Sequence, residues 1–124
     1  MNRASFISAI AHDANFTDCK LEHSVFTSAL MNRAQFGYAV MNKANFISAI
    51  AANANFANCE LNNSNFVIAI IDDADFSNGQ LSGATFMSAL AANANFTNCE
   101  LKNATFTSAL LTNAIFDSAK NFSV

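Results

Sequence analysis

Residues 44–56 read ANFISAIAANANF, and this stretch contains the spacing that decides the fold. Phe46 and Phe56 lie ten residues apart, and an alanine stands two positions before each of them. Midway between them, Ala49 and Ala51 repeat the same spacing. The unit is therefore five residues long and reads small-x-large-x-x, although an alanine holds the large position at residue 51.

The same unit extends in both directions without an insertion. Phenylalanine occupies every tenth position from Phe6 to Phe116. The alternating large positions form a second series: Ala11, Leu21, Met31, Met41, Ala51, Leu61, Ile71, Leu81, Ala91, Leu101 and Leu111. An internal repeat determines architecture before any local rule does. We therefore expect one repeat domain over residues 1–124.

The pattern resembles the pentapeptide-repeat family, whose consensus unit is Ala-Asn/Asp-Leu/Phe-x-x. The tripeptides that begin at Ala14, Ala44, Ala54, Ala74 and Ala94 match it directly. The resemblance covers essentially the whole chain. It implies an all-β fold, a right-handed quadrilateral parallel β-helix with one pentapeptide on each side. It also implies that the small and the large residues both point inward.

The residues before the second series support a coil of 20 residues, because they fall into two alternating classes. One class is aliphatic and consists of Ile10, Leu30, Ile50, Ile70, Leu90 and Leu110. The other is mostly polar and consists of Lys20, Val40, Glu60, Gln80, Glu100 and Lys120. Four distinguishable sides would produce this alternation. We expect about six coils, with Phe6 and its 20-residue successors in one aromatic column and Phe16 and its successors in another.

Composition excludes several classes of function. The chain has 124 residues with 52% hydrophobic content, but its apolar residues are periodic and do not form a membrane-length run. The start of the chain lacks the continuous apolar segment of a signal peptide. A net charge of −3 gives no basic footprint for nucleic acid. We therefore expect a cytoplasmic protein with neither a membrane nor a nucleic-acid partner.

Three cysteines, Cys19, Cys59 and Cys99, occupy the small inward position. They are two coils apart, which separates their backbones by about 9–10 Å, beyond the reach of a disulfide. We therefore expect buried free thiols that pack as small apolar residues. Free thiols fit a reducing compartment such as the cytoplasm.

No residue pattern indicates catalysis. His12 and His23 fall on different sides of the expected solenoid, and no third ligand shares a column with either of them. No nucleophile, phosphate loop or paired carboxylate stands out, and a narrow solenoid offers no concave pocket. We therefore expect a non-enzymatic protein and assign no catalytic residue, no metal ligand and no cofactor.

The most informative outward feature is apolar. The aliphatic class would stack as one surface column, and beside it on the preceding side runs a second row. The expected interface is Ile10, Leu30, Ile50, Ile70, Leu90 and Leu110 with Ile7, Ile47, Val67 and Met87. A contiguous apolar patch on a soluble protein usually marks an interaction surface. The sequence thus predicts a structural or protein-interaction solenoid that forms a homodimer through this side.

Two alternatives remain open at this stage. Some members of the resembled family mimic DNA and inhibit or protect gyrase, which requires an acidic surface. Here the nine acidic residues scatter among six basic ones. End-to-end association is the second alternative, because Phe122 is out of register and no capping helix follows the repeat.

Overall fold

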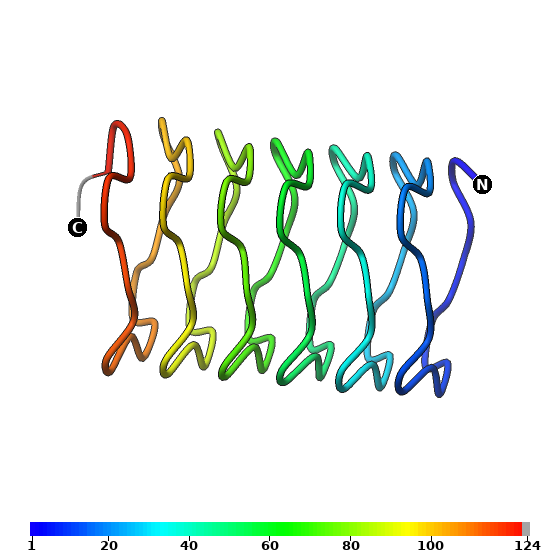
Figure 1. The fold of residues 1–124 in the computed structure, drawn as a ribbon. Coiled ribbons are helices and arrows are strands. Elements are labelled where there is room, and N and C mark those ends of the chain that lie inside the picture. The colour runs from blue at the N-terminus through cyan, green and yellow to red at the C-terminus, as the bar shows by residue number, and fades with distance from the viewer. Residues whose placement is uncertain (123–124) are drawn as a thin grey trace.

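A computed structural model describes residues 1–122 as a solenoid whose coils stack along one axis (Figure 1). Within these residues the regular structure consists of single-residue parallel bridges, with neither a helix nor a longer strand. Each bridge joins a residue to the one 20 positions later, as in Ser5 to Val25 and Lys20 to Val40. The coil therefore contains 20 residues and four sides, as the repeat predicts.

A tight turn forms each corner. Ala44 N donates a hydrogen bond of 3.0 Å to the Met41 carbonyl oxygen, and Lys43 between them has a φ of 63°. A bond from residue i+3 to residue i with a positive φ at i+2 is the geometry of a type II turn. The turn recurs every five residues, and Asn, Asp, Ser or Gly holds most of its positive-φ positions. These residues suit that conformation better than others.

Hydrogen bonds between coils run along every side. Phe46 N donates to the Asn65 carbonyl oxygen at 2.7 Å, and Asn45 N donates to the Ser24 carbonyl oxygen at 3.0 Å. Between the first and the last coil, each bridging position is thus paired with the coil before it and with the coil after it. This pattern satisfies buried backbone groups without long strands.

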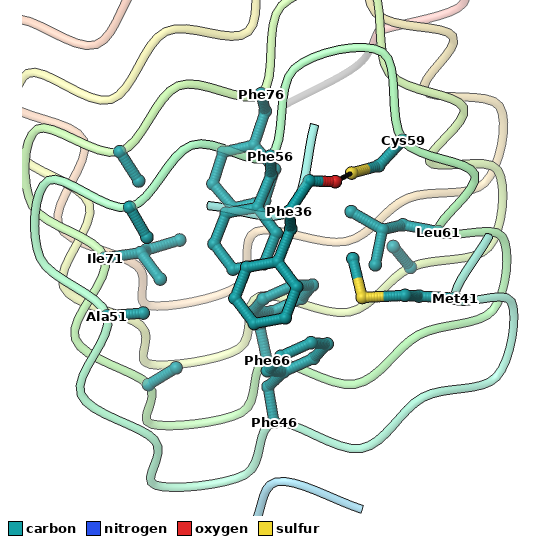
Figure 2. Packing of buried hydrophobic residues seen from close by; sticks show 14 of the residues in the cluster. Phe36, Met41, Phe46, Ala51, Phe56, Cys59, Leu61, Phe66, Ile71 and Phe76 are labelled. Atoms are coloured by element: carbon teal, nitrogen blue, oxygen red, sulfur yellow. Dashed lines mark hydrogen bonds between the residues drawn. The ribbon is translucent and has the colours of Figure 1, made fainter. Parts of the chain in front are cut away.

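The core contains two aromatic columns, which confirms the sequence prediction. Within a column the rings stack in parallel, with Phe26 and Phe46 4.8 Å apart at an interplanar angle of 2°. The two columns also meet edge to face inside the coil, as Phe36 and Phe46 do at 6.1 Å and 87° (Figure 2). Stacked and edge-to-face pairs are the two arrangements that aromatic rings prefer.

The inward positions are as predicted, except at the ends of the stack. Cys59 and Cys99 are fully buried, whereas Cys19 is only half-buried, so the expectation of three buried thiols is wrong for Cys19. Cys19 lies in the first coil, which has a neighbouring coil on one side only. Phe6 is half-buried for the same reason.

Phe122 contributes to the core although it lies outside the repeat register. Its ring stacks on Phe116 at 4.1 Å and meets Phe106 edge to face at 5.6 Å and 86°. It therefore covers the last ring of the repeat with one stacked and one edge-to-face contact, although a phenylalanine in register would stack on Phe106 and meet Phe116 edge to face. Residues 123 and 124 lie outside the described residues.

Candidate functional site

One side of the solenoid carries the predicted aliphatic residues as a single bridged series, which we call the aliphatic ladder. Parallel bridges connect its members in order: Ile10, Leu30, Ile50, Ile70, Leu90 and Leu110. The end members are the most exposed, with Ile10 at 78% and Leu110 at 58%. Leu30, Ile50 and Ile70 are half-buried. In the middle of the ladder each side chain is flanked by its neighbours in the coils above and below.

The second predicted row lies at the corner that leads into the ladder side. We call Ile7, Thr27, Ile47, Val67, Met87 and Thr107 the corner row. The sequence predicted it on the preceding side, whereas the structure puts it at the first exposed turn position between the two sides. Ile47 N and Val67 N each donate to an asparagine side chain two residues earlier, at 2.9 Å. These bonds stabilise the turn that leads into the ladder side. The corner row therefore lies next to the ladder.

Ile68 is a surface residue that the sequence reasoning missed. It is 52% exposed and has a φ of 52°, and it is the one β-branched residue with a positive φ among residues 1–122. Such a conformation costs on the order of 1–3 kcal/mol. The equivalent position in every other coil is a serine: Ser8, Ser28, Ser48, Ser88 and Ser108. That exception was the available signal in the sequence.

Together, the aliphatic ladder, the corner row and Ile68 form a surface that we call the apolar face. None of its members is charged. The whole ladder is about 24 Å tall, from the usual separation of about 4.8 Å between paired strands. Such a surface can bury apolar area against a partner, but it supplies no group for acid–base or nucleophilic chemistry.

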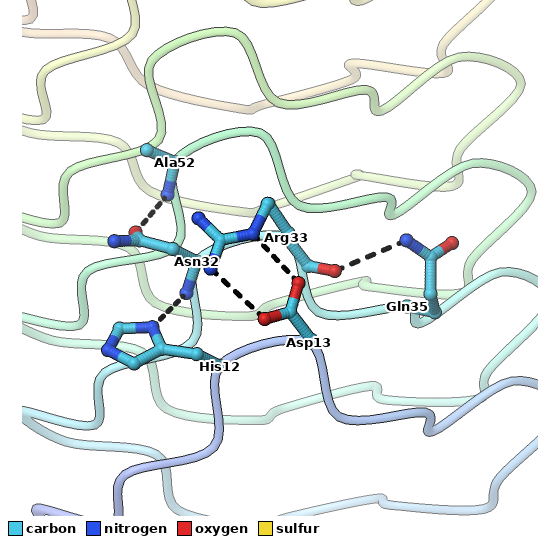
Figure 3. Close-up of polar contacts among 6 residues, drawn as sticks. All are labelled: His12, Asp13, Asn32, Arg33, Gln35 and Ala52. Atoms are coloured by element: carbon cyan, nitrogen blue, oxygen red, sulfur yellow. Dashed lines mark hydrogen bonds and ion pairs between the residues drawn. The ribbon is translucent and has the colours of Figure 1, made fainter.

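The corner that follows the aliphatic ladder along the chain, on the other side from the corner row, is polar (Figure 3). Arg33 Nε and Asp13 Oδ1 are 2.7 Å apart, and Arg33 Nη2 donates to Asp13 Oδ2 at 3.0 Å. The hydrogen bond from Arg33 lowers the pKa of the Asp13 carboxyl below its ordinary value. Both side chains are exposed, so this pair is a solvated boundary of the apolar face and not a buried site.

The two histidines do not come together. His12 Nδ1 accepts a hydrogen bond of 3.0 Å from Asn32 N in the next coil. His23 is exposed at a different corner, at a positive-φ turn position. Across residues 1–122, no three His, Cys, Asp or Glu side chains are grouped so that they could hold a metal ion.

The buried thiols face the backbone of the core. Cys59 Sγ donates to the Phe36 carbonyl oxygen at 2.8 Å (Figure 2), and Cys99 Sγ donates to that of Phe76 at 2.9 Å. Burial raises the pKa of the Cys59 thiol to about 12 and that of the Cys99 thiol to about 11. The thiolate is the reactive form of cysteine, so these two groups are suited to packing and not to redox chemistry.

Comparison with known proteins identifies the repeat. The family described as pentapeptide repeats (8 copies) matches the chain over residues 12–47, 29–67, 39–78, 52–87 and 92–120. A search of curated protein sequences found no match. In the part of the chain that the structure describes, no helix is long and apolar enough to cross a membrane.

Three solved structures have a similar fold. The pentapeptide repeat protein Rfr23 from the cyanobacterium Cyanothece 51142 has a TM-score of 0.70 at 20% identity, over 79% of this chain and 64% of that one. A pentapeptide repeat protein from the Arabidopsis thaliana thylakoid lumen has a TM-score of 0.61 at 23% identity, over 80% of this chain and 62% of that one. Trypsin-treated QnrB1, a plasmid-mediated fluoroquinolone resistance protein, has a TM-score of 0.55 at 13% identity, over 99% of this chain and 74% of that one.

At these identities the likeness shows the fold alone. The chain spans less than two thirds of the first two proteins. The family match covers most of the chain, and the 20-residue bridge register agrees with it. These solved relatives imply a right-handed quadrilateral β-helix. The chain belongs to the pentapeptide-repeat family.

Proposed function

We propose that this protein is a non-enzymatic interaction module that forms a side-to-side homodimer through its apolar face. The observation that carries the proposal is the exposure of large apolar side chains along that face, among them Ile7, Met87 and Leu90 at 59%, 45% and 37%. Soluble monomers rarely expose a contiguous apolar surface of this kind without a partner. The proposal assigns the protein to the cytoplasm, where reducing conditions keep thiols unpaired.

The distribution of charge permits a second copy as the partner. Each molecule carries a net charge of −3, so two copies repel each other over most of their surface. The apolar face contains no charge, and two copies can meet there without bringing like charges into contact. Closed two-fold pairing is the commonest arrangement of soluble homo-oligomers. Such a contact sets the apolar face of one copy against the same face of the other.

The size of the face limits the strength of this association. Burial contributes roughly 25 cal/mol per Å² of apolar area, and association has a large entropic cost. A face about 24 Å tall and little wider than one side falls at the low end of specific protein interfaces. We therefore expect a reversible dimer with a dissociation constant on the order of micromolar.

The test introduces charge in the middle of the aliphatic ladder. The variant combines Ile50→Lys, Ile70→Lys and Leu90→Lys. These side chains point outward, so circular dichroism should show a folded solenoid, while light scattering coupled to size-exclusion chromatography should show a monomer. A dimer that persists in the folded variant would exclude the apolar face as the interface.

A control adds three lysines to the opposite side and changes the net charge by +4, compared with +3 in the ladder variant. Val40→Lys, Glu60→Lys and Gln80→Lys lie in the bridged series two corners away from the ladder. This control should remain dimeric, because its substitutions do not touch the apolar face. If it dissociates as well, added charge in general and not the location of the charge would explain the result.

The alternative function, inhibition or protection of gyrase, has weaker support. QnrB1 shares the fold, but at 13% identity that likeness carries no activity to this chain. The acidic surface is also partly neutralised, since Asp13 is paired with Arg33. We expect no effect in a DNA supercoiling assay with gyrase, with or without a fluoroquinolone.

A further inference from the structure

We propose that Ile68 is the central anchor of this self-association, the residue that each copy inserts into the apolar face of the other. This inference rests on the proposed homodimer and deepens it. It identifies which residue determines the affinity and why the chain has an isoleucine in a backbone conformation that does not suit it.

The first argument is the exception in the repeat. Five of the six coils have serine at this turn position, and only the coil with Ile68 departs from it. The turn geometry is unchanged, since Ser48, Ile68 and Ser88 have φ values of 60°, 52° and 58°. The backbone therefore does not require isoleucine. A β-branched residue is among the least suited to a positive φ.

The second argument is burial. A strained residue usually persists where other interactions compensate for it. In the single chain, however, the Ile68 side chain remains 52% exposed, so packing within the chain offers only part of that compensation. Its neighbours Val67 and Ile70 are themselves half-buried at the surface. Contact with a partner would bury the remaining apolar area.

The third argument is shape. Ile68 lies near the middle of the stack, between Ser48 and Ser88 of the adjacent coils, which are much smaller side chains. The Ile68 side chain is therefore longer than the side chains directly above and below it. In a two-fold dimer, residues near the axis meet the same region of the other copy, so each Ile68 can pack against the partner's apolar face beside the smaller serines. Interface residues that dominate affinity tend to lie near the centre of the contact.

The test restores the residue of the other coils. Ile68→Ser should have two effects of opposite sign. Relief of backbone strain should raise the melting temperature of the monomer by a few degrees, measured below the dimer dissociation constant. Loss of the anchor should weaken dimerisation at least tenfold, measured by sedimentation equilibrium. A substitution that acted only on folding would not move the two readouts in opposite directions.

Tyr38→Asn is the matched control. Tyr38 also has a positive φ of 63° and is 64% exposed, but it lies in another coil, at the diagonally opposite corner of the solenoid. Asparagine is the residue at the equivalent positions 58, 78 and 98. This variant should leave the dissociation constant unchanged within about twofold, whatever its effect on stability.

The outcomes separate this inference from the proposed function. If Ile68→Ser leaves dimerisation unchanged while the three ladder lysines abolish it, the anchor is excluded and the homodimer stands. If the unaltered protein is monomeric even at millimolar concentration, both are overturned. Tenfold weakening by Ile68→Ser with no effect of Tyr38→Asn supports both.

Discussion

At the scale of single residues, the repeat unit is explained by the hydrogen-bonding needs of its corners. Asn45 and Asn65 occupy the second position of the unit, and each accepts a hydrogen bond from the backbone N–H two residues later. At other corners the equivalent N–H donates to an asparagine side chain of the preceding coil. Asn62 N, for example, donates to Asn42 Oδ1 at 2.9 Å. Asparagine thus recurs because its side-chain oxygen accepts hydrogen bonds from turn N–H groups that have no backbone acceptor in a neighbouring coil.

The buried thiols make the folded state less stable at alkaline pH. Burial raises the pKa of Cys59 from an ordinary value of 9.0 to about 12, and that of Cys99 to about 11. The folded chain holds these protons to a higher pH than the unfolded chain does. Their contribution is therefore complete below pH 9 and is lost progressively as the pH rises from about 9 toward 12.

We expect the free energy of unfolding, measured with urea at several pH values, to fall between pH 8.5 and 11. The double variant Cys59→Ala and Cys99→Ala should show a smaller fall over the same range. Alanine already occupies the same position in adjacent coils, at Ala39 and Ala119, so the variant should fold. Identical pH slopes for the two proteins would show that the thiols do not control alkaline stability.

At the scale of the coil, stability comes from contacts between neighbouring coils. Phe66 stacks between Phe46 and Phe86 at 4.6 and 5.0 Å, and it also meets two rings edge to face. Phe6 has one stacked and one edge-to-face partner. In solenoids, total stability is approximately a sum of such nearest-neighbour terms. Position along the stack should therefore set the cost of losing a ring.

Phe66→Ala should lower the free energy of unfolding by about 3–5 kcal/mol, the usual cost of truncating a buried phenylalanine. Phe6→Ala should cost roughly half as much, because its ring is half-buried and has half the ring contacts. Chemical denaturation of both variants measures the two losses. Equal losses would contradict a stability built from neighbouring coils.

At the scale of the whole molecule, the sequence predicts the interior better than the surface. The core positions follow from spacing alone, because only one register places Phe26, Phe46 and their successors inside. The partial exposure of Cys19 and the packing of Phe122 depend on where the stack ends, which spacing does not encode. The strain at Ile68 appears only when the residue is compared with its equivalents one coil away. Ile68 is a departure from the repeat, so periodicity alone does not reveal it.

The proposed dimer also makes the stability of the whole molecule depend on concentration. Partner binding to the folded state stabilises it by mass action. Above the dissociation constant, a tenfold rise in concentration adds about 1.4 kcal/mol per dimer, or half of that per chain. For a domain of this size, that corresponds to a rise of about 2–4 °C in melting temperature. Calorimetry from 10 μM to 1 mM should show this rise for the unaltered protein, but not for the variant with lysines at Ile50, Ile70 and Leu90. A melting temperature independent of concentration in both proteins would mean that folding and association are not coupled.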